Sequence, residues 1–448
     1  MRQIEELRAY PAIHRIFGLF QEQRDAVFLD SSLKNGLGQY SIIGLYPYLK
    51  LVNGGIFTAN GEQQACSFEE YLSRYLAEHR EKNETGLPII SGAVGYFSYD
   101  YGRKKEGVPS CHNRDLRIPE CILCFYDVFI VEDHSQKRLY LVANGRLQEA
   151  GRRLRLLKER IFELNEPEEK QFFGESGVTI TSNFKKDEYL KAVEDVIHYI
   201  TEGDIYIANL TQQLRINSSR PPYEVFKRLR ANNPSPFGGY FNYGNFQVIS
   251  ASPERFLSMN RGHVVTRPIK GTRRRGRTPG EDDLLRRELQ DSQKDKSELL
   301  MIVDLERNDL NRVCIPGSVR VSELFAVEEY ATVFHLVSTV EGDLEEGKTV
   351  VDLLRAGFPG GSITGAPKLR AMEIIDEMEH SRRNLYTGSM GYLTLDGSCD
   401  FNIVIRTALH QNGCYYLGVG GGITCESEPE FEYEETLQKA KAILEALS

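Results

Sequence analysis

The sequence lacks a long apolar run, an excess of basic charge and an N-terminal signal. No apolar stretch approaches the roughly 20 residues that span a bilayer, and the nearest candidate, residues 122–131, contains Asp127. The opening residues MRQIEELR hold no apolar signal core. Lys and Arg number 55 against 64 Asp and Glu, a net charge of −9, which disfavours nucleic acid and anionic membranes as partners. We expect a cytoplasmic protein with no nucleic-acid partner and no membrane partner.

The cysteines also lack a functional pattern. Eight are scattered through 448 residues, a chain too long to depend on disulfides. One CxxC pair, Cys121 and Cys124, lies in the apolar run IPECILCFY without a second pair or an adjacent histidine, which favours buried thiols in a strand over a zinc site. No cysteine lies in a Gly-x-Cys-x-Gly elbow, so no nucleophile for glutamine hydrolysis is indicated.

The remaining composition is that of a globular protein, with 41% apolar and 27% charged residues. Residues 1–165 form the first expected region, which ends in a helix over 148–164. Its expected strands lie near 26–29, 40–43, 93–99 and 139–142 between Gly, Asn and Pro residues. A linker is expected at 165–177, before a second region at 182–448.

The second region mixes helices and strands. Helices are expected over 186–202, 281–311 and 429–447 and from Pro367 onward. Strands are expected near 206–214, 239–243, 247–250, 263–270, 319, 335–340, 390–395, 400–408 and 414–419. This alternation predicts an α+β fold with mainly antiparallel sheets. The similar segments GAVGY (92–96) and GSMGY (388–392) reflect either two related sheet halves or chance.

Two pairs of carboxylates have helical spacing. Glu432, Glu435 and Lys439 fall on one face of the last helix, beside an expected apolar stripe at 437, 440, 444 and 447, and Asp295 and Glu298 are spaced i, i+3. The pairs could meet across a cleft and bind a hard cation such as Mg²⁺. Two solvated faces are the alternative.

Two glycine-rich segments could approach a ligand. GGSITGAPK (360–368) runs into a helix and is either an anion site or a structural turn. GVGGGI (418–423) ends a strand and permits close approach of a ligand or of backbone. On the expected strand at 400–408, Arg406 projects from one face, for a carboxylate ligand or a surface salt bridge.

Lys270 follows a strand and precedes glycine in TRPIKGT (266–272). It is either an exposed lysine or a nucleophile, and the second role requires an amine that is partly neutral. The basic run 273–277 is interpreted as a mobile surface loop. His335, among apolar neighbours, is either a core residue or a catalyst.

Taken in order, these segments resemble the chorismate-utilising enzymes, which include anthranilate synthase component I, aminodeoxychorismate synthase component I and the isochorismate and salicylate synthases. The resemblance spans about residues 182–445, and the N-terminal region fits more loosely. It implies an α+β sandwich of two antiparallel sheets with helices on the outside, like anthranilate synthase component I. The segments that carry it are SPERF (252–256), RPIKGT (267–272), KDKSELLMIVDLERND (294–309), HLVS (335–338), GGSITGAPK (360–368), GSMGY (388–392), IRT (405–407), GGGI (420–423) and EYEETLQK (432–439).

Lys270 favours one branch of this family. Anthranilate synthases usually carry alanine at this position, whereas PIKGT resembles the aminodeoxychorismate synthases. The resemblance implies that Lys270 attacks C2 of chorismate while Glu254 protonates the departing C4 hydroxyl. Ammonia then adds at C4 and displaces the lysine, which gives 4-amino-4-deoxychorismate for para-aminobenzoate and folate synthesis. Anthranilate synthase component I and a non-catalytic chorismate- or amino-acid-binding regulatory protein are the alternatives.

The same resemblance implies the metal, the partner and the remaining site. Glu298 and Glu435 resemble the Mg²⁺ ligands, with Asp295 and Glu432 in support. Ammonia is expected from a separate glutamine amidotransferase small subunit. Residues that match chorismate-binding positions are Arg406, Tyr386, His335, Thr364, Gly365, Ala366, Gly421, Gly422 and Lys439.

Two further positions concern the pocket and the nucleophile. Ser31 resembles the serine of a tryptophan pocket in the first region. Ile207 stands where the salicylate and isochorismate branch carries a water-activating lysine and many amine-transferring relatives carry glutamine. This departure argues against water as the nucleophile and leaves open what replaces the contact made by glutamine.

Overall fold

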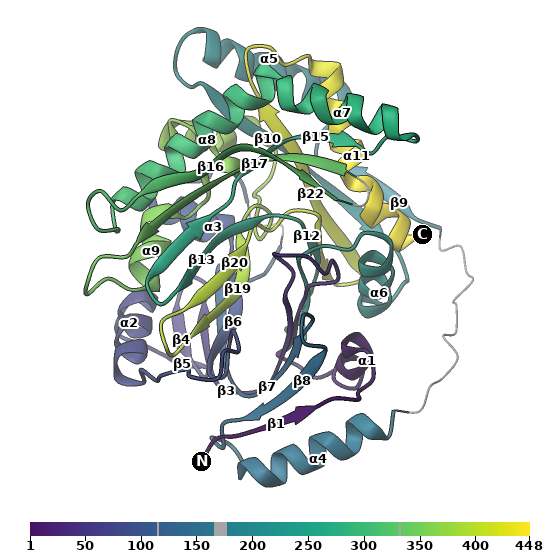
Figure 1. Cartoon of the computed structure of the whole chain (residues 1–448). Coiled ribbons are helices and arrows are strands. Elements are labelled where there is room, and N and C mark those ends of the chain that lie inside the picture. Colours follow the sequence, from purple (N-terminus) through teal and green to yellow (C-terminus); the bar gives the residue numbers. More distant parts are fainter. Residues whose placement is uncertain (114–115, 165–176, 331–332) are drawn as a thin grey trace.

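The computed structural model describes residues 1–113, 116–164, 177–330 and 333–448 (Figure 1). Its helices are α1 (Ile13–Gly18), α2 (Phe68–Glu78), α3 (Tyr99–Lys105), α4 (Ala150–Phe162), α5 (Lys186–Thr201), α6 (Pro222–Asn232), α7 (Pro279–Asp291), α8 (Gln293–Asn311), α9 (Val350–Gly357), α10 (Lys368–Met378), α11 (Pro429–Leu447) and the 3₁₀ turn η1 (Gly361–Ile363).

The strands of the described chain pair antiparallel throughout. They are β1 (Gln3–Leu7), β2 (Ala26–Asp30), β3 (Tyr40–Asn53), β4 (Phe57–Ala59), β5 (Glu62–Gln63), β6 (Gly92–Phe97), β7 (Cys121–Asp133), β8 (Arg138–Ala143), β9 (Thr179–Ser182), β10 (Ile207–Asn217), β11 (Phe237–Asn242), β12 (Gln247–Ser252), β13 (Arg255–Asn260), β14 (His263–Thr266), β15 (Ile269–Arg274), β16 (Arg320–Glu329), β17 (Val333–Asp343), β18 (Gly365–Ala366), β19 (Ser389–Thr394), β20 (Cys399–Asn402), β21 (Thr407–Gln411) and β22 (Cys414–Ile423).

Two runs of hydrogen-bonded strands meet at the long strands β3 and β7. One run follows β10, β22, β21, β12, β11, β2 and β3. The other continues from β7 through β6, β19, β20, β13, β14, β17 and β16. Helices such as α4, α5, α7 and α8 lie outside these strands (Figure 1). The predicted α+β fold with antiparallel sheets is confirmed.

Strand β7 explains why the sheets are covered on both sides. Every one of its residues is buried, which requires apolar neighbours on both faces because side chains alternate along a strand. Leu123 and Phe125 pack into the apolar cluster shared with α2, α8 and α9, whereas Ile122 and Tyr126 pack between the sheets. Buried Asp127 is satisfied by the backbone amides of residues 146 and 147.

Cys121 and Cys124 illustrate the same alternation. Both thiols are free and buried, and they belong to apolar clusters on opposite faces of β7. The two sulfur atoms therefore do not share a ligand, and the predicted buried strand thiols are confirmed.

Three expected boundaries are wrong. The helix expected over 281–311 is two helices, because Ser292 adopts an extended conformation and its hydroxyl caps α8 by accepting the Asp295 amide. The strand expected at 263–270 is divided between β14 and β15 around Pro268, which has no N–H to donate. The strand expected at 400–408 ends at Asn402, and Arg406 lies outside it with φ of 49°.

Two surface interpretations also change. The basic run 273–277 is held by acidic residues, with Arg273 paired to Glu288 and Arg275 paired to Asp282, and is not a free loop. On α11, the buried face contains Thr436, Ala440, Ile443 and Leu447, so the expected stripe is displaced and Leu437 is exposed.

Strands from the two expected regions share the same sheets. β2 pairs with β11, and β6 pairs with β19, so the similar segments at 92–96 and 388–392 are neighbours in the sheet. The expected linker at 165–177 lies outside the described residues except for Gly177, and the division into 1–165 and 182–448 stays a prediction. None of the helices in the described chain combines the length and the apolar character needed to cross a bilayer.

Candidate active site

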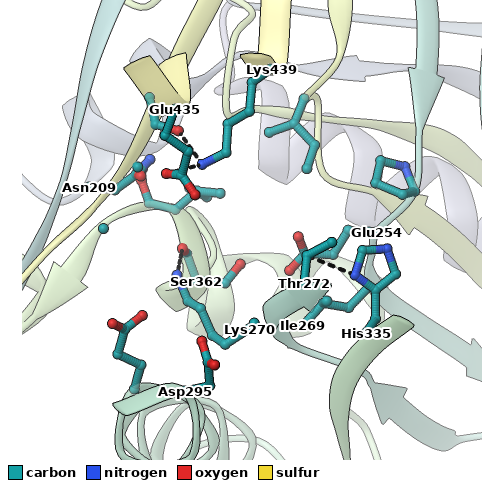
Figure 2. Close-up of a pocket in the computed structure, with 18 of the residues that line it drawn as sticks. Asn209, Glu254, Ile269, Lys270, Thr272, Asp295, His335, Ser362, Glu435 and Lys439 are labelled. Atoms are coloured by element: carbon teal, nitrogen blue, oxygen red, sulfur yellow. Dashed lines mark hydrogen bonds and ion pairs between the residues drawn. The ribbon is translucent and has the colours of Figure 1, made fainter. Parts of the chain in front are cut away.

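A cavity of about 680 Å³ lies where β10, β15 and β22 approach α8 and α11 (Figure 2). It contains most of the residues expected to carry chemistry. These are Glu254, Lys270, Asp295, Glu298, His335, Tyr386, Arg406, Gly421, Gly422, Glu432, Glu435 and Lys439. The two acidic pairs lie on helices α8 and α11, which are more than a hundred residues apart in sequence.

Lys270 enters the cavity from β15. Its Nζ donates a hydrogen bond to the carbonyl oxygen of Ser362 at 3.2 Å, and Figure 2 shows this amine above Asp295. Gly271 follows with φ of 74°, and a Cβ there would lie 2.8 Å from the Asp295 carboxyl carbon. Glycine therefore permits both the turn of the backbone and the close approach of α8 beside the lysine.

Glu254 lies between β12 and β13 and faces the same cavity. Burial raises its pKa to about 6, although the charge of Lys270 opposes the shift. Its Oε1 atom and the Ser362 hydroxyl are both buried without a hydrogen-bond partner in the described structure. Unsatisfied buried polar atoms are costly, which indicates that this end of the cavity is built to bind a polar ligand.

The four carboxylates form two pairs on facing helices. Asp295 and Glu298 project from α8, and Glu432 and Glu435 project from α11. Burial raises the pKa of Glu298 and of Glu432, and the charge of Glu435 raises both further. Lys439 donates to Glu435 Oε2 at 2.8 Å and to the Gly420 carbonyl at 2.8 Å.

These acids fit a hard divalent cation. Carboxylate oxygens are the donors that Mg²⁺ prefers, and a cation would offset the repulsion that raises the two pKa values. A Cβ at Gly421 would lie 2.7 Å from Glu435 Oε2 and 3.2 Å from Glu432 Oε2, so glycine leaves room for both acids. Among the described residues, no three of these carboxylates have oxygen atoms that all lie within 4.8 Å of one another.

Arg406 supplies a positive charge without a fixed acidic partner. Its guanidinium makes no hydrogen bond or ion pair within the described residues, and burial lowers its pKa while Glu254 opposes this shift. Figure 2 shows His335 near Thr272, whose hydroxyl lies 2.9 Å from His335 Nδ1. Burial and the charge of Arg406 lower the pKa of His335 to about 4, so its imidazole is neutral at physiological pH.

Not every expected residue lines the cavity. Thr364 is buried and its hydroxyl donates to the Gly360 carbonyl at 2.9 Å. Gly365 and Ala366 form β18, which pairs with β10, and all three lie outside the cavity lining. Their contact with chorismate stays a prediction.

Sequence reasoning missed Asn209 and the backbone of Ser362. Asn209 lines the cavity from β10, and its side-chain amide donates to the Ile363 carbonyl at 3.3 Å. A polar residue within the apolar stretch IANL was the available signal. The role of the Ser362 carbonyl could not be predicted from the sequence, because every residue has a backbone carbonyl.

Ile207 provides an apolar contact near the lysine. Its side chain is 2% exposed, and a Cβ at Gly422 would lie 3.1 Å from Ile207 Cδ1 and 3.6 Å from Lys270 Nζ. An aliphatic group thus lies near the amine, at the position where the resemblance leaves open what replaces the contact of glutamine.

Tyr386 lies flat against Gly418, and this contact gives a test of the cavity wall. A Cβ at Gly418 would lie 2.2 Å from the ring carbon Cγ of Tyr386, so Gly418→Ala displaces the ring. We expect kcat/KM for chorismate to fall at least about tenfold and Tm to fall, as overpacking costs about 1–3 kcal/mol. Gly280→Ala, where the added Cβ meets nothing within 4 Å, is the control. An unchanged kcat/KM in Gly418→Ala would remove Tyr386 from the binding wall.

A smaller cavity of about 70 Å³ lies at Ser31, between β2, β11, β19 and β20. The Ser31 hydroxyl donates to the Pro236 carbonyl at 2.7 Å. The cavity has roughly a tenth of the volume of the larger one, and the tryptophan pocket expected there stays a prediction.

Residues 46–445 match the family described as chorismate binding enzyme, and the chain belongs to this family. Among its relatives, aminodeoxychorismate synthase component 1 of Bacillus subtilis (strain 168) is 38% identical over 439 residues, covering 96% of this chain and 93% of that protein. Anthranilate synthase component 1 of Acetivibrio thermocellus is 35% identical over 465 residues, covering 98% of this chain and 94% of that protein.

The solved structures confirm the fold. The crystal structure of anthranilate synthase component I from Streptococcus pneumoniae TIGR4 matches with a TM-score of 0.82 at 29% identity, covering 92% of this chain and 93% of that one. The predicted architecture like that of anthranilate synthase component I is therefore correct. Relatives with two different products have similar identities, so the choice between products depends on the residues of the site.

Proposed function

We propose that this chain is the large subunit of an aminodeoxychorismate synthase, which converts chorismate and ammonia to 4-amino-4-deoxychorismate and water. The observation that carries the proposal is the position of Lys270. Its amine lies inside the cavity, 3.2 Å from the Ser362 carbonyl, and the buried acid Glu254 lines the same cavity. A nucleophile and a proton donor thus face one substrate space.

The first step joins Lys270 to the ring. Its neutral amine forms a bond to C2, the ring double bonds shift, and the C4–O bond breaks. Glu254 donates its proton to the departing hydroxyl, which leaves as water. The new secondary ammonium carries the extra proton, which can return to the Glu254 carboxylate.

The second step transfers nitrogen to C4. Ammonia bonds to C4, the double bonds shift back, and the C2–N bond breaks as the protonated lysine nitrogen departs as an amine. Two displacements return the new nitrogen to the carbon that lost oxygen. A single displacement would leave nitrogen at C2, which is the ortho arrangement, so a covalent lysine step accounts for a para product.

The acids and cations of the cavity hold the substrate. Mg²⁺ bound by Glu298 and Glu435, with Asp295 and Glu432 in support, would neutralise the ring carboxylate and draw electron density from the diene. Arg406 has no fixed acidic partner and suits a bidentate contact with a carboxylate. The Gly421 and Gly422 amides, Lys439, Tyr386 and neutral His335 complete the proposed binding site.

Ammonia is proposed to come from a glutamine amidotransferase small subunit, with the product directed to para-aminobenzoate and folate. The absence of a Gly-x-Cys-x-Gly elbow from the sequence motivates this partner. The cytoplasmic location expected from the sequence stays a prediction.

The pH dependence follows from the buried acid. In the reactive state of the Glu254–Lys270 pair, the Glu254 carboxyl is protonated and the Lys270 amine is neutral. When each group carries a proton, the amine has no free electron pair and cannot bond to C2. As the pH rises through the Glu254 pKa of about 6, one of the two protons is lost and the reactive arrangement becomes accessible. We therefore expect kcat/KM for chorismate to rise through about pH 6.

Glu254→Gln tests this assignment. We expect the variant to lose the inflection near pH 6 and about a hundredfold or more in rate, the usual contribution of a general acid. Initial rates measured from pH 5 to pH 9 at about constant ionic strength provide the profile. If the rise of kcat/KM near pH 6 persists in Glu254→Gln, a group other than Glu254 is responsible for it.

Product analysis tests the function as a whole. The protein is incubated with chorismate, Mg²⁺ and ammonium, and the products are identified by chromatography with mass spectrometry. We expect 4-amino-4-deoxychorismate without pyruvate. Ortho-aminobenzoate with pyruvate would identify an anthranilate synthase, and chorismate binding without turnover would identify a regulatory protein.

A further inference from the structure

A second cluster of potential metal ligands lies away from the cavity, where Cys111 and His112 contact the C-terminal end of α10. Cys111 Sγ lies 3.3 Å from His112 Nε2. One ligand atom from each of Cys111, His112 and Asp376 lies within 4.8 Å of the others. Thiolate, imidazole and carboxylate are the three ligand types that bind zinc in proteins.

The spacing of these atoms agrees with tetrahedral coordination. Zn–S bonds of about 2.3 Å and Zn–N bonds of about 2.0–2.1 Å place sulfur and nitrogen about 3.5 Å apart at a tetrahedral angle. The observed separation is 3.3 Å. The backbone holds this arrangement, because the Cys111 amide donates to Asp376 Oδ2 at 2.8 Å and Arg382 donates to the His112 carbonyl at 2.7 Å.

Negative charge at the cluster comes from Asp376 and from the end of α10. Asp376 lies in the last turn of α10, which contains no basic residue, and helix C-termini carry partial negative charge. The Cys111 thiol and the His112 imidazole both contact the Asp376 carbonyl oxygen, at 3.3 Å and 2.7 Å. Two donors therefore converge on one acceptor, and a cation bound by sulfur and nitrogen would replace both protons.

We propose that Cys111, His112 and Asp376 bind one zinc ion, with water in the fourth position. The ion would join the segment before β7 to α10, the helix that follows the glycine-rich turn beside the cavity. Zinc binds the thiolate form of cysteine, so binding at Cys111 would release the proton of its thiol. The site is independent of the proposed amination and remains testable if that proposal fails.

Cobalt binding tests the thiolate ligand. The full chain, purified under reducing conditions and treated with a chelator, is titrated with Co²⁺ in the presence of saturating Mg²⁺, which occupies the acidic pairs of the cavity. We expect a thiolate-to-cobalt charge-transfer band at one equivalent in the wild type and in Cys425→Ser, the matched control at another exposed free cysteine. We expect no band in Cys111→Ser.

Thermal unfolding with zinc supplies a second measurement. At a hundredfold excess over Kd, ZnCl₂ should raise Tm by about 3 °C in the wild type and in Cys425→Ser. The rise should be absent in Cys111→Ser, and Asp376→Asn should weaken binding about tenfold or more. A missing cobalt band, or equal bands and equal Tm shifts in Cys111→Ser and the wild type, would overturn the site.

Discussion

Lys270→Ala is expected to lower the rate of amination at C4 at least about a thousandfold, as loss of a covalent nucleophile typically does. The amine lies in the cavity and is held by the Ser362 carbonyl. Without it, ammonia can react only by single displacement at C2, so residual product should shift toward the ortho series. Rates and product ratios with chorismate, Mg²⁺ and ammonium provide the measurement.

Lys270→Arg separates covalent chemistry from electrostatics. Arginine keeps the positive charge and a donor for the Ser362 carbonyl, but its guanidinium stays protonated and does not act as a nucleophile. We expect it to be nearly as inactive as Lys270→Ala. Normal para product from either variant would remove the covalent step from the mechanism.

Glu298→Ala and Glu435→Ala are each expected to lower kcat/KM for chorismate more than about a hundredfold. Each variant removes a proposed Mg²⁺ ligand from a different wall of the cavity, one on α8 and one on α11. Loss of a ligand should weaken metal affinity at least as much as the roughly 10- to 100-fold known for supporting groups. Activity measured against Mg²⁺ concentration should show a higher half-saturating concentration.

Glu434→Ala is the matched control for these variants. It lies on α11 next to Glu435 and is exposed to solvent outside the cavity lining. We expect its activity and Mg²⁺ dependence to equal those of the wild type. Full activity in Glu298→Ala and Glu435→Ala would leave the acidic pairs without a catalytic role.

Local patterns predicted the elements that have clear ends. The helix expected over 429–447 matches α11, because Pro429 is favoured in a first helical turn and acidic residues follow it. The break at Ser292 was not apparent, because a single N-cap residue within a polar sequence resembles ordinary helix surface. Arg406 was assigned to a strand because alternation continued past Asn402, whereas its positive φ depends on tertiary contacts.

Only part of the candidate site could be predicted from the sequence, because the rest depends on tertiary contacts. Helical spacing placed Glu432 and Glu435 on one face, but it contained no information on whether α8 would lie opposite. Only the fold brings Lys270 and Glu254 to one cavity. The resemblance supplied these pairings in advance, whereas the apolar contact of Ile207 beside the lysine required the three-dimensional structure.

Mass spectrometry of the intact protein tests the central claim most directly. The wild type and Lys270→Arg are incubated with chorismate and Mg²⁺ without ammonia, so that the second displacement cannot occur. The account predicts an adduct on the wild type with the mass of chorismate less one water, mapped by peptide analysis to Lys270 and released by ammonium. A wild type that forms the para product with ammonium, yet carries no adduct at Lys270 under rapid quenching, would contradict it.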